Sequence, residues 1–158
     1  ACYSHAVHVA EIVVDTLTGE IQVETVWSVQ DVGRIVNPVG LEGQIEGGIA
    51  MGLGYALSEE LKIEDGIVLN PYFRDYHLFT APQMPRFDLT FIETADAEGP
   101  AGAKGIAELP TIVIAPAIGN ALYNATGLRI DHPPLTPEKV ARGLWDRAQG
   151  SESEHTRT

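Results

Sequence analysis

Between residues 41 and 57, large apolar side chains recur at every fourth position, and glycines fill many of the positions between them. The apolar stripe consists of Leu41, Ile45, Ile49, Leu53 and Leu57. This spacing is typical of an amphipathic helix that buries one stripe. A glycine inside a helix costs up to about 1 kcal/mol relative to alanine, so the many glycines here need a compensating reason. Close approach of another backbone, or of a bulky ligand, is the usual one.

Strand-like segments flank this expected helix. Residues 5–14 carry apolar or small side chains at alternating positions on both faces, which suits a strand covered on both sides. Turn residues at 15–19 join them to a second alternating segment, residues 20–29, so a hairpin is expected. Asp65-Gly66 between two apolar runs predicts another hairpin. Residues 87–93 alternate as a further strand.

The second half of the chain predicts two more helices. An apolar stripe from Ile114 to Ala125 indicates a helix that ends at Gly127, with Pro116 tolerable only in its first turn. Residues 128–130 suggest a short strand. Thr136 is a good N-cap for a last helix over residues 136–148. Together these elements predict an α+β fold in layers, with one domain over residues 1–150 and a disordered polar tail over residues 151–158.

Composition narrows the function classes. The chain has 158 residues, one domain's worth, with 44% hydrophobic residues, which is ordinary for a soluble globular protein. A net charge of −12 leaves no basic footprint, so neither nucleic acid nor an anionic membrane surface is an expected partner. The single cysteine, Cys2, excludes an internal disulfide and fits a reducing, cytoplasmic compartment. We find no signal peptide and no apolar run of the roughly 20 residues that would span a membrane.

The segment from Gly99 to Pro110 is the most informative for chemistry. Its glycines and alanines leave almost no side-chain bulk, so its backbone can approach another group closely. The ionisable side chains between Pro100 and the next helix are Lys104 and Glu108. Two interpretations of Glu108 remain open on this ground: a charge partner for a helix N-terminus, or a general base that projects into a pocket.

Other candidate sites have weaker support. The glycines of residues 43–54 lack the Lys-Ser or Lys-Thr of a phosphate-binding loop. His5 and His8 fall on opposite faces of a strand, which is poor geometry for two ligands of one metal, so no protein-held metal site is expected. Asp75 and His77 fit a local structural cluster better than an active site.

Four ordered motifs together resemble a known family. They are Asp-Val-Gly-x-x-x-Asn-Pro at residues 31–38, Gly-Gln-Ile-Glu-Gly-Gly at 43–48 running into Met-Gly-Leu-Gly-Tyr at 51–55, Gly-Ala-Lys-Gly-Ile-Ala-Glu at 102–108, and Ala-Pro-Ala-Ile-Gly-Asn-Ala at 115–121. The series is similar to the carboxy-terminal part of the molybdopterin-binding large subunit of molybdenum hydroxylases, the xanthine dehydrogenase and aldehyde oxidoreductase family. The resemblance covers residues 5–144.

The resemblance implies a role for particular residues. Glu108 matches the catalytic base that deprotonates the molybdenum-bound hydroxyl before this attacks an electron-poor carbon, with water as the oxygen source. Gln44 matches the glutamine that lies against the molybdenum cofactor. Lys104 and Gly105 are assigned to the surroundings of the same cofactor. One departure is Ala107, where the family commonly has glycine; a positive φ there would cost about 1 kcal/mol.

The resemblance also implies cofactors and partners. The cofactor is molybdopterin, alone or as the cytosine dinucleotide, and the substrate is a small aldehyde, purine or other N-heterocycle. The remaining molybdopterin-binding part of the large subunit completes the site. A [2Fe-2S] cluster needs four ligands, and this chain has one cysteine. Iron-sulfur centres, and with them FAD, are therefore expected only in partner domains or subunits. The chain should be inactive alone. The alternatives are a non-catalytic structural remnant of the same fold and, more distantly, a hydrolase that pairs Glu108 with Asp75 or Asp96.

Overall fold

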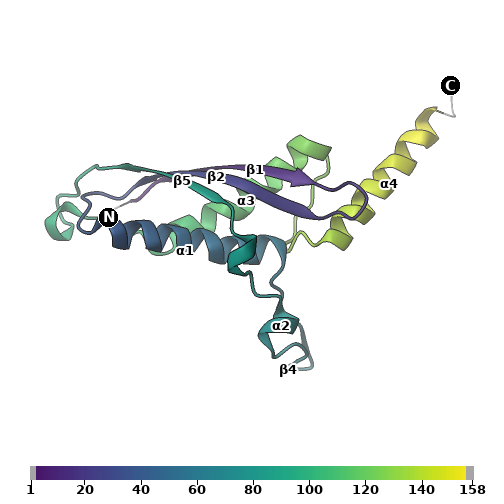
Figure 1. The fold of residues 1–158 in the computed structure, drawn as a ribbon, viewed down its shortest axis with the longest axis horizontal. Coiled ribbons are helices and arrows are strands. Elements are labelled where there is room, and N and C mark those ends of the chain that lie inside the picture. Colours follow the sequence, from purple (N-terminus) through teal and green to yellow (C-terminus); the bar gives the residue numbers. More distant parts are fainter. Residues whose placement is uncertain (1–2, 156–158) are drawn as a thin grey trace.

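The computed structural model describes residues 3–155, with side chains for residues 3–149. The helices and strands follow in chain order (Figure 1): β1 (Ala6–Val14), β2 (Ile21–Asp31), α1 (Pro38–Leu57), β3 (Ile63–Glu64), β4 (Ile67–Val68), α2 (Phe73–Tyr76), the 3₁₀ helix η1 (Ala81–Gln83), β5 (Arg86–Ile92), the 3₁₀ helix η2 (Pro100–Gly102), α3 (Leu109–Thr126) and α4 (Pro137–His155). The predicted α+β class is confirmed.

A three-stranded sheet with the order β1-β2-β5 forms one layer. The predicted hairpin is confirmed, because β1 and β2 pair antiparallel. In the turn between them, the Asp15 carboxylate accepts hydrogen bonds from the backbone N–H groups of Leu17 and Thr18, at 2.8 and 3.1 Å. Strand β5 then pairs parallel to β2, so the chain crosses over through α1 before it returns to the sheet. The smaller predicted hairpin around Asp65-Gly66 is also present, as β3 and β4.

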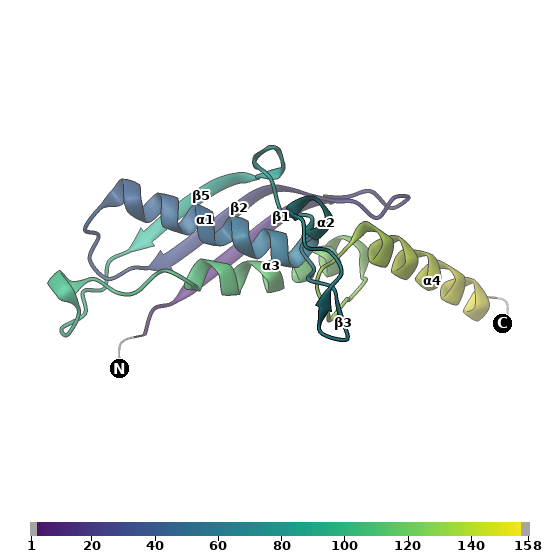
Figure 2. The same ribbon diagram turned by 90° about the horizontal axis from the view of Figure 1, so that it is seen from below.

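Helices α1 and α3 lie side by side on one face of the sheet (Figures 1 and 2) and form the second layer. The apolar stripe that the sequence indicates on α1 is buried there, facing the stripe of α3 and the inner face of β2. Burying one such side chain contributes roughly 1.5–3 kcal/mol. Nine hydrophobic core residues among those described have no exposed surface: Val26, Ile45, Ile49, Leu53, Ala56, Ile114, Ile118, Leu122 and Val140.

The other face of the sheet is open in the described residues. Val7, Val9 and Val13 of β1 are exposed by 63%, 56% and 56%. The expectation that residues 5–14 are covered on both sides is therefore wrong for this chain. The alternation of apolar residues was interpreted correctly as a strand, but α1 and α3 cover only one of its two apolar faces.

The ends of α1 and α3 show how local sequence sets their boundaries. Asn37 caps α1, because its side-chain oxygen accepts a hydrogen bond from the Gly40 N–H at 3.1 Å, and Pro38 occupies the first turn. Helix α3 begins at Leu109, earlier than expected, so Pro116 lies in its interior and not in its first turn. That expectation was wrong, because the apolar stripe starts only at Ile114 and gives no sign of the first turn of the helix, which precedes it. Gly127 ends α3 in the left-handed conformation, as predicted.

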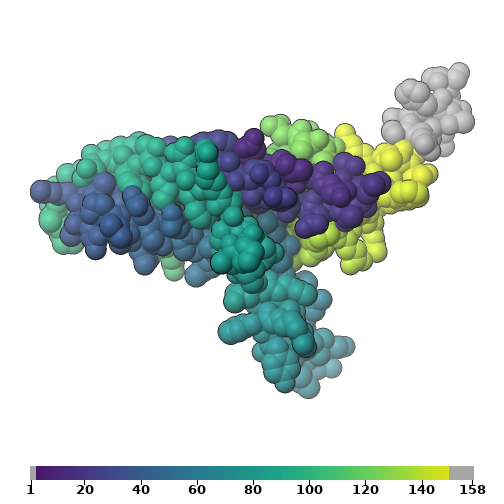
Figure 3. All heavy atoms as spheres, in the orientation of Figure 1, coloured from purple at the N-terminus to yellow at the C-terminus, as the bar shows by residue number. Residues whose placement is uncertain are grey.

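A peripheral arm projects from the layered body. Residues 58–80, with β3, β4 and α2, form an arm that protrudes on the side of α1 (Figure 3). Asn70 organises the base of this arm, because its buried side chain forms hydrogen bonds with the backbone of Glu60 and Lys62 at 2.6 and 2.8 Å.

The short strand expected at residues 128–130 is absent from the structure, where these residues form an irregular connection to α4.

Helix α4 starts where the sequence indicates. Thr136 accepts a hydrogen bond from the Lys139 N–H at 3.3 Å, and Pro137 opens the helix. Its backbone continues to His155, while the side chains from residue 150 and all of residues 156–158 lie outside the described residues. The division into a domain at 1–150 and a tail at 151–158 therefore stays a prediction. In the part of the chain that is described, none of the helices has the length and apolar character needed to cross a bilayer.

Candidate cofactor and catalytic site

A cavity of about 520 Å³ lies between residues 43–51 of α1 and the start of α3. Gln44 and Glu108 both line it, although they are far apart in the sequence. The other lining residues are Gly43, Gly47, Gly48, Met51, Ala107, Thr111 and Ile112. The fold therefore brings together two of the residues that the resemblance singles out, in a cavity that is also lined by three glycines.

Close packing of α1 against α3 creates this arrangement. A Cβ atom added at Gly48 would lie 2.8 Å from Pro110 Cγ, and one at Gly52 would lie 2.2 Å from Ile114 Cγ2. The Thr111 hydroxyl also donates a hydrogen bond to the Gly48 carbonyl at 3.0 Å. Only glycine lets the two backbones approach so closely, so Gly48 and Gly52 set the distance between the helix that carries Gln44 and the helix that Glu108 precedes.

Gly43 and Gly47 have a different environment. A Cβ atom added at either would meet no atom within 4 Å, since both glycines face the cavity. The chain's own packing does not explain these two glycines. A large planar ligand that lies against the helix backbone does explain them, so the residues fit a bulky cofactor at this position.

Glu108 occupies the N-cap position of α3. Its carbonyl accepts hydrogen bonds from the N–H groups of Thr111 and Ile112, at 3.1 and 3.3 Å. Its side chain makes no capping hydrogen bond, is exposed, and has no ion pair among the described residues. The helix dipole still favours a negative charge at this position. The carboxylate is nevertheless held by no donor, which leaves it able to act on a bound molecule.

Ala107 does not strain the loop. Among the described residues, the non-glycine residues with positive φ are Asp65, His77 and Ala101. Ala107 is thus in a conformation that any residue adopts, and its methyl group replaces the family's glycine without the backbone cost of about 1 kcal/mol considered for a positive φ.

A neighbouring cavity of about 370 Å³ shares Gln44 with the first and is also lined by Lys104 and Arg34. Gln44 thus separates the two spaces and can offer its amide to either. Gly105 lines neither cavity; its carbonyl accepts a hydrogen bond from the Ser4 hydroxyl at 2.9 Å. The structure thus groups Gln44 with Glu108 on one side and with Lys104 on the other, but it does not bring Gly105 into the cavity wall. Cofactor contacts of Lys104 and Gly105 stay predictions.

Asp31 and Thr94 belong to the surroundings of Lys104 and were not identified as site residues from the sequence. The Lys104 ammonium donates to the Asp31 carboxylate at 2.6 Å and to the Thr94 hydroxyl at 2.8 Å. Asp31 belongs to the Asp-Val-Gly motif, which is one of the four motifs of the resemblance. No role was assigned to Asp31 from that motif. Thr94 lies in a segment with no motif, so the sequence carries no signal for it.

The carboxylates considered as partners of Glu108 lie elsewhere. Asp96 accepts hydrogen bonds from the N–H groups of Glu98 and Gly99, and Asp75 belongs to α2 on the projecting arm. Neither lines the cavity of Glu108. The structure therefore does not form the carboxylate pair of the hydrolase alternative. Among the described side chains, residues 3–149, no group of three or more His, Cys, Asp or Glu residues could hold a metal ion.

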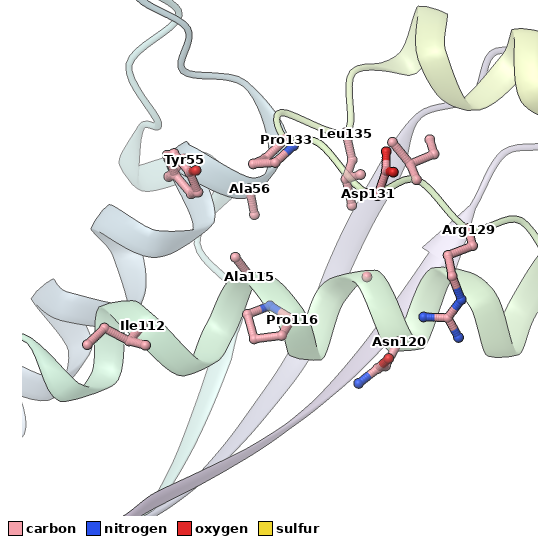
Figure 4. A pocket seen from close by; sticks show the side chains of 12 residues that line it. Tyr55, Ala56, Ile112, Ala115, Pro116, Asn120, Arg129, Asp131, Pro133 and Leu135 are labelled. Atoms are coloured by element: carbon pink, nitrogen blue, oxygen red, sulfur yellow. The ribbon is translucent and has the colours of Figure 1, made fainter.

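A third cavity of about 410 Å³ lies between the C-terminal end of α1, helix α3 and the connection that follows α3 (Figure 4). Ile112 lines both this cavity and that of Glu108. Tyr55 of α1, Asn120 of α3 and two charged residues of the following connection, Arg129 and Asp131, are its polar members. Arg129 is partly engaged, because its guanidinium lies 4.3 Å from the centre of the Tyr123 ring. No pattern in the sequence indicates this cavity.

The layered α+β unit thus places a cavity that is lined by three glycines beside the Glu108 carboxylate. Residues 1–85 match the family described as molybdopterin cofactor-binding domain. The chain belongs to this family. The predicted membership is thus confirmed.

Curated relatives carry the match further along the chain. The chain is 38% identical over 132 residues to the xanthine dehydrogenase molybdenum-binding subunit of Escherichia coli O157:H7, a stretch that covers 82% of the chain and 18% of the relative. It is 37% identical over 165 residues to the nicotine 6-hydroxylase large subunit of Paenarthrobacter nicotinovorans, with 92% of the chain and 20% of the relative covered. The chain thus spans about a fifth of the length of these relatives.

A solved structure shows the same fold. The aldehyde oxidoreductase from Desulfovibrio desulfuricans ATCC 27774 superposes with a TM-score of 0.84 and 36% sequence identity. The superposition covers 90% of this chain and 16% of the oxidoreductase. The chain is therefore similar to one part of a molybdenum-hydroxylase large subunit over nearly its whole length.

Proposed function

We propose that this chain is part of a molybdenum-dependent hydroxylase, in which Glu108 is the catalytic base and Gln44 contacts the molybdopterin cofactor. The observation that carries the proposal is the cavity that Gln44 and Glu108 share between α1 and α3. The relatives are named for xanthine, nicotine and aldehyde chemistry, which supports a small aldehyde, purine or other N-heterocycle as the substrate class.

Residues 43–51 of α1 form the cofactor side of the cavity. Gly43 and Gly47 let a large flat group approach the helix backbone, because no side chain occupies the space in front of them. The Gln44 amide supplies one donor group and one acceptor at the same wall. When bound, the molybdenum cofactor supplies the redox centre that takes two electrons from the substrate carbon.

The proton-transfer side of the cavity is the start of α3. Glu108 accepts the proton of the water-derived nucleophile as this attacks the substrate carbon. The carboxylate has no competing hydrogen bond or ion pair among the described residues, so its oxygens are available for that proton. A positioned general base contributes about 10²–10⁴-fold to rate.

Other polypeptide must complete the site. The cavity is open and Glu108 and Gln44 are exposed in this chain, whereas a reaction of this kind needs water to be excluded around it. The relatives are about five times longer than the stretch they share with this chain, which supports the remaining molybdopterin-binding part of the large subunit as the second wall. Iron-sulfur and FAD centres then belong to partner domains or subunits, and the chain alone is inactive.

Substitution of Glu108 in the assembled enzyme that contains this chain tests the proposal. Glu108→Gln keeps the shape of the side chain but removes the base, so we expect turnover to fall about 10²–10⁴-fold with molybdenum content unchanged. Glu98→Gln is the matched control, because Glu98 is an exposed carboxylate in the same loop region that does not line the cavity. Turnover in Glu108→Gln within twofold of the Glu98→Gln control would refute the assignment.

A further inference from the structure

Asp31, the last residue of β2, is the centre of a buried polar cluster beside the proposed site. Its side chain is 11% exposed. It accepts hydrogen bonds from the Lys104 ammonium at 2.6 Å, from the Thr94 hydroxyl at 2.6 Å and from the Gly33 N–H at 3.2 Å. These donors, Lys104 first among them, hold the pKa of Asp31 well below its usual range, so the carboxylate stays charged.

Lys104 is equally constrained from its own side. Its side chain is 10% exposed, and its ammonium also donates to the Thr94 hydroxyl at 2.8 Å and to the Tyr3 carbonyl at 3.2 Å. His5 Nδ1 lies 4.0 Å from the Asp31 carboxylate at the open side of the cluster. A buried ion pair with this many additional hydrogen bonds has a defined geometry, and removal of one partner would leave the other charge buried and unpaired.

The backbone repeats the same connection. The Lys104 N–H donates to the Val32 carbonyl at 3.1 Å, and the Arg34 N–H donates to the Gly102 carbonyl at 2.8 Å. Gly33 and Ala103 form an isolated antiparallel bridge between these two bonds. Residues 102–104 are thus held against residues 32–34 by an isolated β-bridge, with the Asp31–Lys104 ion pair at one end.

Each of the two joined segments leads directly to one wall of the proposed site. Residues 32–37 run into the N-cap of α1, whose second turn carries Gln44. Residue 104 is followed by a short stretch that ends at Glu108, and in this stretch only Ile106 packs against the core. The Asp31–Lys104 ion pair therefore ties together the two segments that present Gln44 and Glu108.

We propose that Asp31 is a positioning residue: through Lys104 it holds the loop that presents Glu108 at a fixed place relative to Gln44. The proposal rests on the proposed function of Glu108. It assigns to the Asp-Val-Gly motif a mechanical role in the active site, although Asp31 itself lines neither cavity. It also makes Lys104 primarily the ionic partner of Asp31.

Hydrogen exchange of the 158-residue chain tests the connection itself. In Asp31→Asn, we expect the amides of Arg34 and Lys104, which form the bridge, to exchange about tenfold faster or more, because local opening becomes easier. Asp15→Asn is the matched control: the Asp15 carboxylate accepts two backbone hydrogen bonds, but it lies at the far end of the same hairpin. It should leave the exchange of both bridge amides unchanged.

Kinetics of the assembled enzyme test the consequence for the site. Asp31→Asn and Lys104→Met should each lower kcat about tenfold or more at unchanged KM and molybdenum content, because a small displacement of a catalytic group is costly. The neutral double variant should be no slower than either single variant, since it leaves no unpaired buried charge. A purely structural role predicts a parallel loss of intact enzyme and molybdenum with kcat per molybdenum unchanged. Thr94→Val, which keeps both charges, provides a milder variant that folds if Asp31→Asn does not, and it should lower kcat in the same direction.

The outcomes separate the two proposals. Bridge amides that exchange at the wild-type rate in Asp31→Asn would overturn the positioning role, and so would a kcat per molybdenum within twofold of wild type. If Glu108→Gln abolishes turnover while Asp31→Asn does not affect it, the positioning role alone fails. If Glu108→Gln keeps its turnover, the proposed function fails and the positioning role falls with it, whatever the exchange rates show.

Discussion

The two sides of the α1–α3 junction differ in whether contacts within the chain account for their polar residues and glycines. On the anchored side, Gly48 and Gly52 contact α3 and Lys104 is held by Asp31. On the open side, Gly43, Gly47, Gln44 and Glu108 contact nothing that explains them. The two sides lie within the same motifs, separated by a few residues.

Within one motif, some residues are therefore required by the fold itself and others are not. Residues on the anchored side are explained by packing distances and ion pairs within the chain, so they account for the fold. On the open side, the chain supplies no packing contact for the residues of α1 and only the favourable helix dipole for Glu108. A ligand or a further polypeptide segment is the reason that we propose for their presence. The comparison predicts opposite consequences for similar substitutions on the two sides.

The largest effect on stability is expected from the glycines of α1. In Gly52→Ala, the new Cβ would lie 2.2 Å from Ile114 Cγ2 and 2.8 Å from the Thr111 carbonyl oxygen, so the helices must move apart. Overpacking of this kind costs typically 1–3 kcal/mol, which exceeds the helix-propensity gain of up to about 1 kcal/mol from alanine. The free energy of unfolding of the chain, measured by urea denaturation, should therefore fall.

Gly47→Ala is the matched substitution on the open side of the same helix. Nothing lies within 4 Å of its added Cβ, so the propensity gain of about 0.5–1 kcal/mol should appear as increased stability. A shift of the urea midpoint in the same direction for both substitutions would contradict the difference in packing between the two sides.

A pH-dependent effect on stability is expected from His8, a buried histidine of β1. His8 is 8% exposed on the inner face of β1, and burial lowers its pKa from 6.5 to about 4. The folded state therefore binds a proton at lower pH than the unfolded state. Stability is fully present above pH 6.5 and is lost as the pH falls from 6.5 toward 4, by about 1–2 kcal/mol after allowance for the partial access of solvent.

His8→Phe isolates this contribution. The difference in unfolding free energy between the variant and the wild type should change with pH between 4 and 6.5 and be constant above it. His132→Phe is the control, because His132 is exposed and its substitution leaves the buried ring unchanged. An identical pH dependence in His8→Phe and wild type would show that His8 is not held neutral by the fold.

Much of the fold was predictable because local signals agree with it. The period-four stripe gave α1, alternation gave β1 and β2, and Asp15, Gly127 and Thr136 marked a turn and two helix ends. The errors have a common cause: sequence patterns report apolar faces but not what covers them. The outer face of β1 looks buried and is open, and the stripe of α3 does not reveal its first turn.

The site was predictable only in part for the same reason. Glu108 and Gln44 were found through a resemblance, and their common cavity depends on the long-range contact of Gly48 and Gly52 with α3, which no local pattern contains. Asp31 was recorded as part of a motif, but its partner lies 73 positions away along the chain. Pairings across such separations are decided by tertiary packing.

The central claim is that one cavity has two functional walls, with cofactor contact at Gln44 and proton transfer at Glu108. The most direct test is to measure molybdenum content and kcat per molybdenum side by side in the Gln44→Ala and Glu108→Gln forms of the assembled enzyme. The account predicts that Glu108→Gln keeps its molybdenum and loses turnover by about 10²-fold or more, whereas Gln44→Ala loses molybdenum. Full molybdenum content and unchanged turnover in both variants would contradict it.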